Sequence, residues 1–200
     1  MPYEYRKLSQ TERQEVVEIR KQRGFPLHAP PHPFRDEGTF LITAANFEHK
    51  MVMTAPERKT EFQEILLRGF HEIKAEIIGW VILSNHYHIL ATVESLNLIS
   101  SLLQYLHGKT SRDWNSQDGM TGKRKIWYRF SDRLMRDEAQ LNQALNYVHY
   151  NPVKHGYVKD VYDWPWSSLL TYEEDKGKEW LRESWKKYAP PADFGKDWDV

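Results

Sequence analysis

The most regular hydrophobic pattern in the chain is an apolar stripe that predicts a helix over residues 57–74. Its members recur at i, i+3, i+4, i+7, i+8 and i+11, the spacing of one face of an α-helix: Phe62, Ile65, Leu66, Gly69, Phe70 and Ile73. The same periodicity predicts helices over 96–107 and 137–151. A shorter helix is expected over 11–23, with Thr11 as its cap.

Between these helices, shorter apolar runs predict strands. Residues 77–83 form a continuous apolar run, typical of a central strand that is buried on both faces. Ser84 and Asn85 follow as a turn, and 86–93 returns as the second strand of a hairpin. Two further short runs, at 40–43 and 126–130, predict the remaining strands.

The order strand, helix, hairpin, helix, strand, helix indicates an α+β fold, with a ferredoxin-like antiparallel sheet and helices on one face. A chain of 200 residues is long enough for one compact domain with terminal extensions. We expect an N-terminal extension at 1–37, the main domain at 38–170 and an acidic C-terminal tail at 171–200. Within the main domain, the stretch 111–125 is expected to be a loop, because it is rich in Gly, Ser, Asp and Lys.

Composition narrows the class of protein. With 40% hydrophobic residues the chain can form a packed core, and it contains no cysteine. Disulfides, thiolate metal sites and cysteine nucleophiles are therefore excluded. We find no apolar run of membrane-spanning length and no secretory signal, so a cytoplasmic location is expected, without a membrane partner.

The zero net charge hides an uneven distribution. Residues 109–136 hold eight basic and three acidic side chains, whereas 160–200 hold six basic and ten acidic ones. The basic stretch is a plausible contact surface for nucleic-acid phosphates, although an ordinary solvated surface explains it equally well. The candidate DNA-binding residues are Lys109, Arg112, Lys123, Arg124, Arg129 and Arg133.

Two histidines alternate along the second strand of the predicted hairpin. His86 and His88 point to one face of the sheet, while Tyr87 and the apolar residues after it point to the other, which should be covered by helices. Two imidazoles side by side on the uncovered face can converge on one divalent ion. A pair of purely structural histidines has the same spacing, so this pattern alone leaves both interpretations open.

A tyrosine and an asparagine share one flank of the predicted helix 137–151. Tyr147 and Asn151 are separated by one helical turn at the edge of its apolar stripe, whereas Tyr150 points away from the core. A tyrosine that acts as a nucleophile needs such a position, beside a cation that polarises the phosphate. The alternative is a helix-edge tyrosine that buries its ring, with Asn151 ending the helix before Pro152.

Four sequence motifs together resemble the REP-associated tyrosine transposases, relatives of the smallest insertion-sequence transposases. His86-Tyr87-His88 resembles the HUH motif of single-strand nucleases, and the segment from Tyr147 to Val158 resembles the catalytic-helix signature of the family. The segments 127–134 and 163–168 resemble the stretches that flank this helix in the family. The resemblance covers about residues 38–170.

This resemblance implies a function and a site. His86, His88 and Asn151 would bind Mg²⁺ or Mn²⁺, and Tyr147 would attack a phosphate of single-stranded or hairpin DNA, such as a palindromic repeat, to form a 5′-phosphotyrosine. The protein would be an endonuclease and transposase associated with the nucleoid, as a monomer or homodimer. Related enzymes have Gln at the helical position of Asn151.

Two other functions are compatible with the sequence. A domesticated nucleic-acid-binding module of the same fold would bind DNA without cutting it, although all four proposed site residues are present. A zinc hydrolase built on His86 and His88 would need a further strong ligand. The other available histidines are not spaced in a way that indicates one: His71, His107, His149 and His155.

Overall fold

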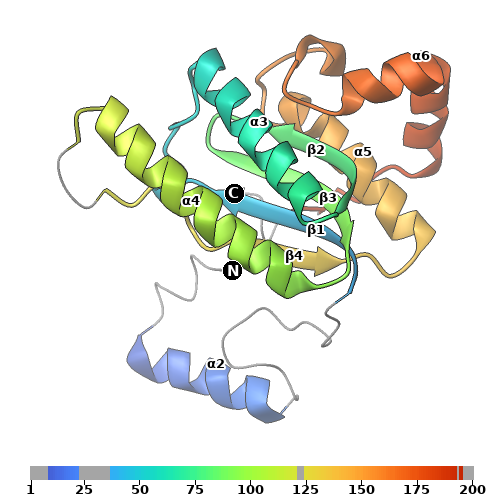
Figure 1. The fold of residues 1–200 in the computed structure, drawn as a ribbon. Coiled ribbons are helices and arrows are strands. Elements are labelled where there is room, and N and C mark those ends of the chain that lie inside the picture. Colours follow the sequence, from blue (N-terminus) through green and yellow to red (C-terminus); the bar gives the residue numbers. More distant parts are fainter. Residues whose placement is uncertain (1–8, 23–36, 121–123, 193, 196–200) are drawn as a thin grey trace. The chain divides into compact units, whose positions relative to one another are not determined.

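The computed structural model describes residues 9–22, 37–120, 124–192 and 194–195 (Figure 1). Contacts between Cα atoms divide the chain into two compact units, and Asp36–Phe194 is one of them. This unit holds every described helix and strand except α2 (Gln10–Gln22). None of the described helices is long and apolar enough to cross a membrane.

The centre of the larger unit is a four-stranded sheet in which all neighbouring strands are antiparallel. The strand order is β2-β3-β1-β4 and the chain order is β1-α3-β2-β3-α4-β4, so the predicted ferredoxin-like α+β fold is confirmed. The strands are β1 (Gly38–Ala45), β2 (Glu76–Ile82), β3 (His86–Val93) and β4 (Ser131–Leu134).

Four long helices accompany this sheet, with two short 3₁₀ turns, η1 (Phe47–His49) and η2 (Val161–Asp163). Figure 1 shows α3 and α4 side by side in front of the strands, and α5 and α6 on the other side. The helices are α3 (Pro56–Glu72), α4 (Leu96–Gln117), α5 (Glu138–Lys154) and α6 (Leu169–Lys187).

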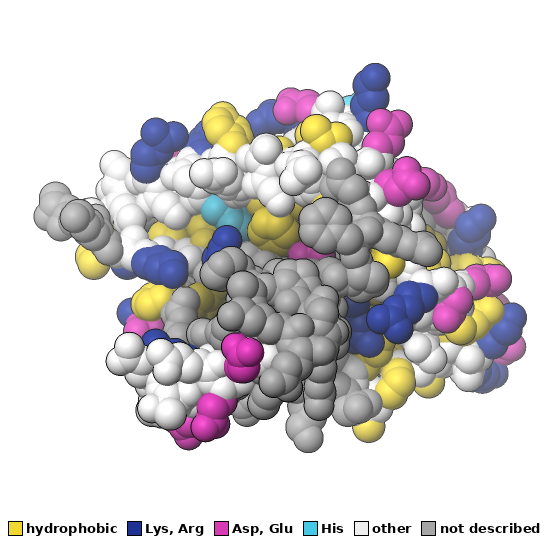
Figure 2. All heavy atoms as spheres, turned by 90° about the horizontal axis from the view of Figure 1, so that it is seen from below, with side chains coloured by type: hydrophobic (Ala, Val, Ile, Leu, Met, Phe, Trp, Pro, Cys, Tyr) yellow, Lys and Arg dark blue, Asp and Glu magenta, His cyan; other side chains and the backbone are white. Residues whose placement is uncertain are grey.

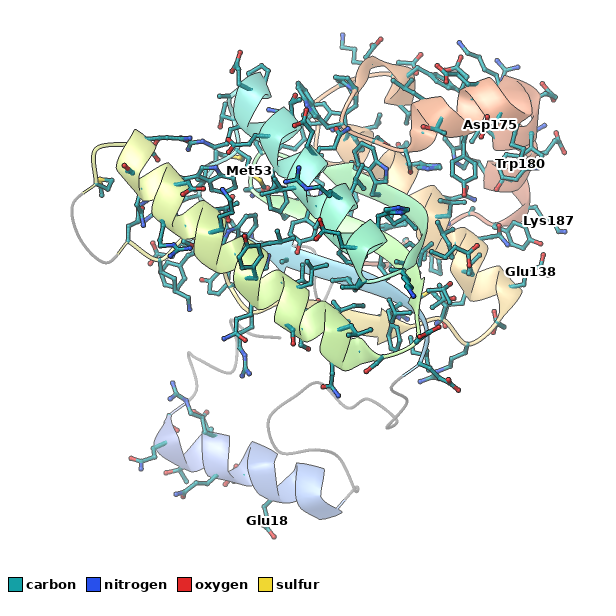
Figure 3. All side chains as sticks on the ribbon, viewed as in Figure 1. Glu18, Met53, Glu138, Asp175, Trp180 and Lys187 are labelled. Carbon is teal, nitrogen blue, oxygen red and sulfur yellow. The ribbon has the colours of Figure 1, made fainter. Side chains whose placement is uncertain are left out.

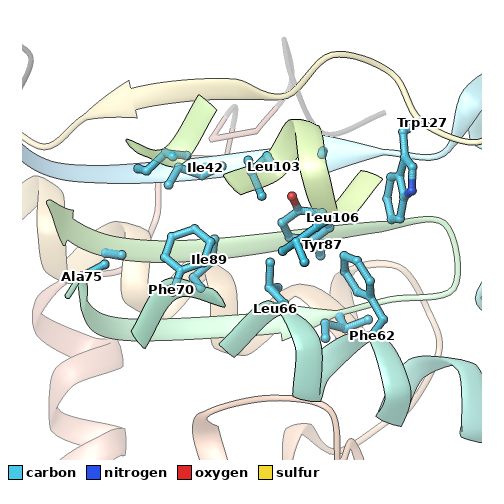
Figure 4. Close-up of a cluster of buried hydrophobic side chains, with 14 of the residues drawn as sticks. Ile42, Phe62, Leu66, Phe70, Ala75, Tyr87, Ile89, Leu103, Leu106 and Trp127 are labelled. Carbon is cyan, nitrogen blue, oxygen red and sulfur yellow. The ribbon is translucent and has the colours of Figure 1, made fainter. Parts of the chain in front are cut away.

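The main hydrophobic core lies between the sheet and helices α3 and α4 (Figure 4). Alternate residues of β3, Tyr87 and Ile89, point into it and are fully buried, as the period of two predicts. The predicted stripe of α3 supplies Phe62, Leu66 and Phe70, all buried. Tyr87 therefore belongs to the core, as expected from the sequence.

The opposite face of the sheet is not left uncovered, because α5 packs against β2 and β3 there. The close approach requires Gly79: a Cβ atom at this position would lie 2.5 Å from Cδ1 of Leu145 on α5. The face of β3 that carries His86 and His88 is thus buried beneath a helix. Long-range packing of this kind leaves no signature in the local periodicity.

Three boundaries differ from the sequence predictions. Helix α4 continues to Gln117, so the loop predicted from residue 111 is wrong in its first part: Trp114 faces the core while the polar residues around it face solvent. The last strand is β4, later than 126–130, where Trp127 makes only an isolated bridge. Helix α5 accommodates Pro152 in its last turn and does not end at Asn151.

The cap of the N-terminal helix also differs. Ser9, not Thr11, precedes α2, and it forms a reciprocal capping box with Glu12. The backbone N–H of Ser9 donates to the Glu12 carboxylate over 2.7 Å, and the backbone N–H of Glu12 donates to the Ser9 hydroxyl over 3.3 Å. At the start of α5, the Asp137 side chain is the N-cap and accepts from the backbone N–H of Gln140.

Helix α6 begins at Leu169, just before the segment expected to be an acidic tail, and continues into that segment with a kink at Gly177. It packs against α5. The buried amide of Asn146 on α5 donates to the backbone carbonyls of Ser184 and Tyr188, each over 3.0 Å. Near the same end, Glu138 at the start of α5 lies beside Lys187 at the end of α6 (Figure 3). The site-bearing helix is therefore held on both sides, by the sheet and by α6.

Candidate active site

The two histidines of β3 lie together on the buried face beneath α5. Their ring centroids are 5.1 Å apart, and the exposed fractions are 5% for His86 and 0% for His88. In the neighbouring strand, Thr43 lies directly opposite His88, and its hydroxyl is 2.6 Å from Nδ1 of that ring. The alternation of side chains along the strand predicted that the two histidines share a face. The pairing of β1 with β3 shows in addition that Thr43 lies beside them.

Helix α5 brings Tyr147 and Asn151 to these histidines. The Tyr147 and His88 ring centroids are 5.3 Å apart, and Oδ1 of Asn151 lies 3.3 Å from Nε2 of His86. Both α5 side chains are buried, more deeply than their predicted half-buried place on the helix edge. Four residues from two elements, more than 50 positions apart in the sequence, thus form one cluster.

The hydroxyl of Tyr147 has a cationic neighbour on its own helix. Lys154 lies two turns further along α5; its Nζ is 3.4 Å from the hydroxyl oxygen and 4.7 Å from the ring centroid. On another side of the ring, Phe194 packs at a centroid distance of 4.9 Å. Tyr150, by contrast, is 50% exposed and points away from the cluster, as predicted.

The other histidines have different positions. His155 follows α5, and its ring centroid is 4.9 Å from that of His86. His107 was expected at a helix end but lies inside α4, stacked on Trp127 and hydrogen-bonded to the Tyr87 hydroxyl. His149 is a buried residue of α5, and its Nε2 lies 3.0 Å from the Ser168 hydroxyl. Burial lowers the pKa of each of these two, His107 and His149, to about 3.

Within the part of the chain that the structure describes, no three His, Asp or Glu side chains gather in a way that could hold a metal ion. The third protein ligand beside His86 and His88 would have to be an amide oxygen, that of Asn151. This composition argues against the zinc hydrolase, which needs a further strong ligand.

The six basic candidates for DNA binding do not behave alike. Lys109 is paired with Asp113 on the next turn of α4, and Arg124 is paired with Asp118 while its Nε donates to Asn115. The side chains that remain exposed are Arg112, Arg129 and Arg133, whereas Lys123 lies outside the described residues. On the face drawn in Figure 2, basic and acidic side chains are interspersed.

Comparison with known proteins identifies the class. A model of the family described as transposase IS200 like matches residues 41–151, more than half of the chain, from β1 to Asn151. The chain is therefore a DNA-processing enzyme of the transposase class. It belongs to the IS200-like transposase family.

Curated relatives and a solved structure agree with this assignment. A REP-associated tyrosine transposase of Haemophilus influenzae is 32% identical over 134 residues, which are 62% of this chain and 74% of the relative. One from Escherichia coli is 33% identical over 134 residues, 66% and 76% of the two chains. A REP-associated tyrosine transposase solved bound to a REP hairpin has the same fold, with a TM-score of 0.57, 23% identity and coverage of 72% and 84%.

Sequence reasoning did not single out three residues that the structure places at the cluster: Thr43, Asn85 and Lys154. Lys154 follows Tyr147 by seven residues, so it lies on the same flank of a helix, but ending that helix at Asn151 hid the relation. Thr43 could be found only from the register of β1 against β3. The sequence predicts Asn85 only as a turn residue.

Proposed function

We propose that this chain cuts and rejoins single-stranded DNA through a covalent bond between the Tyr147 hydroxyl and the 5′ phosphate of the cut strand. Mg²⁺ or Mn²⁺ would be held by His86, His88 and Asn151. The observation that carries this proposal is the convergence of the four side chains in one buried cluster, from β3 and from α5. Structural histidines alone would not need a tyrosine and an amide beside them.

The side chains of the cluster fit a divalent ion. Oδ1 of Asn151 faces Nε2 of His86 at 3.3 Å, and the Asn151 Nδ2 is buried without a hydrogen-bond partner among the described residues. Imidazole nitrogens and an amide oxygen are suitable ligands for Mn²⁺, and the amide oxygen suits Mg²⁺. Such an ion, when bound, polarises the phosphate and offsets the charge that develops on it.

The reaction exchanges one bond to phosphorus for another. The Tyr147 oxygen forms a bond to the phosphorus as the bond to the 3′ oxygen breaks. The phenol loses a proton and the departing oxygen gains one, so the products are a 5′-phosphotyrosine and a 3′-hydroxyl. Because a phosphodiester is retained, attack by a 3′-hydroxyl in the reverse direction rejoins the strand.

The chain's own residues support the attacking oxygen. Lys154 places an ammonium group 3.4 Å from the Tyr147 hydroxyl, where it stabilises negative charge as the O–H bond is lost. His88 and Phe194 pack on the ring and fix its direction. The helix itself is held between the sheet and α6, which limits displacement of the hydroxyl.

The proposed substrate is single-stranded or hairpin DNA. One solved structure of the same fold carries a REP hairpin, which supports this choice. Arg112, Arg129 and Arg133 are the candidates for phosphate contacts, because these three side chains are exposed. Arg133 also lies over the ring of Phe194, 5.3 Å from its centroid. The non-cutting binding module is disfavoured, since all four proposed site residues are present and converge.

The decisive experiment is covalent trapping. Incubation with a labelled hairpin or single strand and Mn²⁺ should yield a protein–DNA adduct that survives denaturation. Tyr147→Phe removes only the hydroxyl and should abolish the adduct, while DNA binding stays nearly unchanged. Tyr150→Phe is the matched control on the same helix and should form it normally.

Other outcomes distinguish the alternatives. An adduct that persists in Tyr147→Phe would refute the assignment of the nucleophile. Cleavage without any adduct would favour a water nucleophile. Binding without cleavage, in the presence of metal, would favour the domesticated module.

A further inference from the structure

Asn85, the residue before the first histidine, is fixed in orientation by two separate hydrogen bonds. Its backbone carbonyl accepts from the backbone N–H of Asn46 over 2.7 Å. Its side-chain Nδ2 donates to the backbone carbonyl of His49 over 3.3 Å. Since a carbonyl only accepts, this second contact requires the nitrogen end of the amide to point at His49.

The oxygen end of the same amide therefore faces His86. Oδ1 of Asn85 lies 2.7 Å from Nδ1 of the His86 ring, a short and well-formed contact. An amide oxygen cannot donate, so Nδ1 must carry the proton. In a neutral imidazole the other nitrogen is then unprotonated, and its lone pair points along Nε2.

That lone pair is directed at the proposed metal position. Nε2 of His86 faces Oδ1 of Asn151 at 3.3 Å, so two acceptor atoms oppose each other in a buried site. Two acceptors at this separation repel unless a cation lies beside both. The protonation of His86 thus matches what a metal ligand requires.

We propose that Asn85 is a positioning residue that holds His86 in the Nδ1-protonated tautomer, with Nε2 ready to bind the metal. This inference rests on the proposed function for the identity of the ligand, but the tautomer is a property of the metal-free protein. Asn85 acts only through His86 and does not contact the reacting atoms. It keeps the ring in one orientation and one protonation state before the ion arrives.

The second histidine is held differently. Nδ1 of His88 faces the Thr43 hydroxyl at 2.6 Å, and a hydroxyl can either donate or accept. Thr43 orients the ring without dictating where its proton sits. Asn85 therefore requires the metal-binding tautomer at His86, whereas Thr43 is compatible with either tautomer of His88.

The first test is a spectroscopic measurement on the metal-free wild-type chain. Histidine ¹⁵N NMR at about pH 8, above the ordinary imidazole pKa, distinguishes the two tautomers of His86. We expect the proton on Nδ1, and in Asn85→Ala we expect a mixture or the Nε2-protonated form. A wild-type ring protonated on Nε2 would overturn the inference, whatever the protein does with metal.

The second test measures Mn²⁺ affinity by calorimetry, without any cleavage. Loss of an outer hydrogen-bond partner of a ligating histidine weakens metal binding by about 10- to 100-fold, and we expect this for Asn85→Ala. Asn85→Asp keeps an acceptor at the same place and should retain most of the affinity. Asn142→Ala, on the first half of α5, is the matched control and should bind as wild type does.

These outcomes separate the inference from the proposed function. If the wild type binds Mn²⁺ and Asn85→Ala binds it equally well, the inference is wrong and the metal site stands. Equal losses in Asn85→Asp and Asn85→Ala would also refute it. If the wild type binds no Mn²⁺, the metal-dependent function fails, while the NMR measurement still tests the tautomer. Should Asn85→Ala not fold, the Asp variant and the wild-type spectrum decide.

Discussion

The two faces of β3 differ in how well their buried polar side chains are hydrogen-bonded. On the α3 and α4 face, the Tyr87 hydroxyl is paired with His107, so the core contains a satisfied polar contact among apolar neighbours. On the α5 face, Nε2 of His86 lies 3.3 Å from Oδ1 of Asn151, and the buried Nδ2 of Asn151 has no hydrogen-bond partner among the described residues. A fold maximised for stability would not retain the second arrangement, since buried polar groups without good partners are costly. The comparison separates the face that stabilises the domain from the face that carries the proposed active site.

The largest effect is expected when the two histidines on the α5 face of β3 are removed together. The double variant His86→Ala, His88→Ala should lose Mn²⁺ binding in calorimetry and all adduct formation. Its thermal unfolding midpoint should fall little, because the apolar core lies on the other side of the sheet. Retained Mn²⁺ affinity in this variant would show that the ion binds elsewhere.

A smaller effect is expected at Lys154, whose Nζ lies 3.4 Å from the hydroxyl of Tyr147, the proposed nucleophile. A hydrogen bond to a charged group contributes about 1.5–3 kcal/mol, which corresponds to a rate loss of about 10- to 100-fold in Lys154→Met. Single-turnover adduct formation at saturating DNA should show this loss, while DNA affinity changes little. Lys154→Arg retains the charge and should recover part of the rate. If Lys154→Arg were as slow as Lys154→Met, the electrostatic role would be contradicted.

The stabilising face should be sensitive to acid. Burial lowers the pKa of His107 to about 3, below the value of about 6.5 in an unfolded chain. The unfolded state therefore binds a proton first, and this contribution to stability is present above about pH 6.5 and is lost as the pH falls toward 3. This histidine alone should lower the free energy of unfolding by about 1.4 kcal/mol per pH unit in that range. Denaturant titrations should show a shallower pH dependence in His107→Gln; an identical slope would exclude this histidine as the cause.

The smallest effect concerns the surface arginines. Removing one phosphate contact should reduce the salt dependence of single-strand binding by about 0.7 in log–log slope. We expect this reduction for Arg129→Gln or Arg133→Gln. Lys109→Gln, which disrupts an ion pair with Asp113, should leave the slope unchanged. Fluorescence anisotropy measures these slopes. A reduced slope in Lys109→Gln, with unchanged slopes in Arg129→Gln and Arg133→Gln, would place the DNA path at Lys109 instead.

The contrast also explains what could be predicted from the sequence. Strand alternation separated His86 and His88 from Tyr87, and helical periodicity put Tyr147 and Asn151 on one flank, since both are local regularities. The covering of the histidine face by α5 depends on packing between Gly79 and Leu145, far apart in the chain. The end of α4 was missed because Trp114 alone marks its buried side among polar residues.

The contact that permits α5 to lie on the sheet has a consequence for ion size. The proposed metal ligands lie on two separate elements, β3 and α5. The distance between α5 and the sheet is set where Gly79 lacks a side chain and Leu145 occupies the space. Metal–oxygen distances are about 2.0–2.1 Å for Mg²⁺ and about 2.3–2.6 Å for Ca²⁺, a difference smaller than the displacement one methyl group would impose. The spacing between the strand and the helix therefore limits the size of the ion that can bind. Gly79, which permits this spacing, has no side chain.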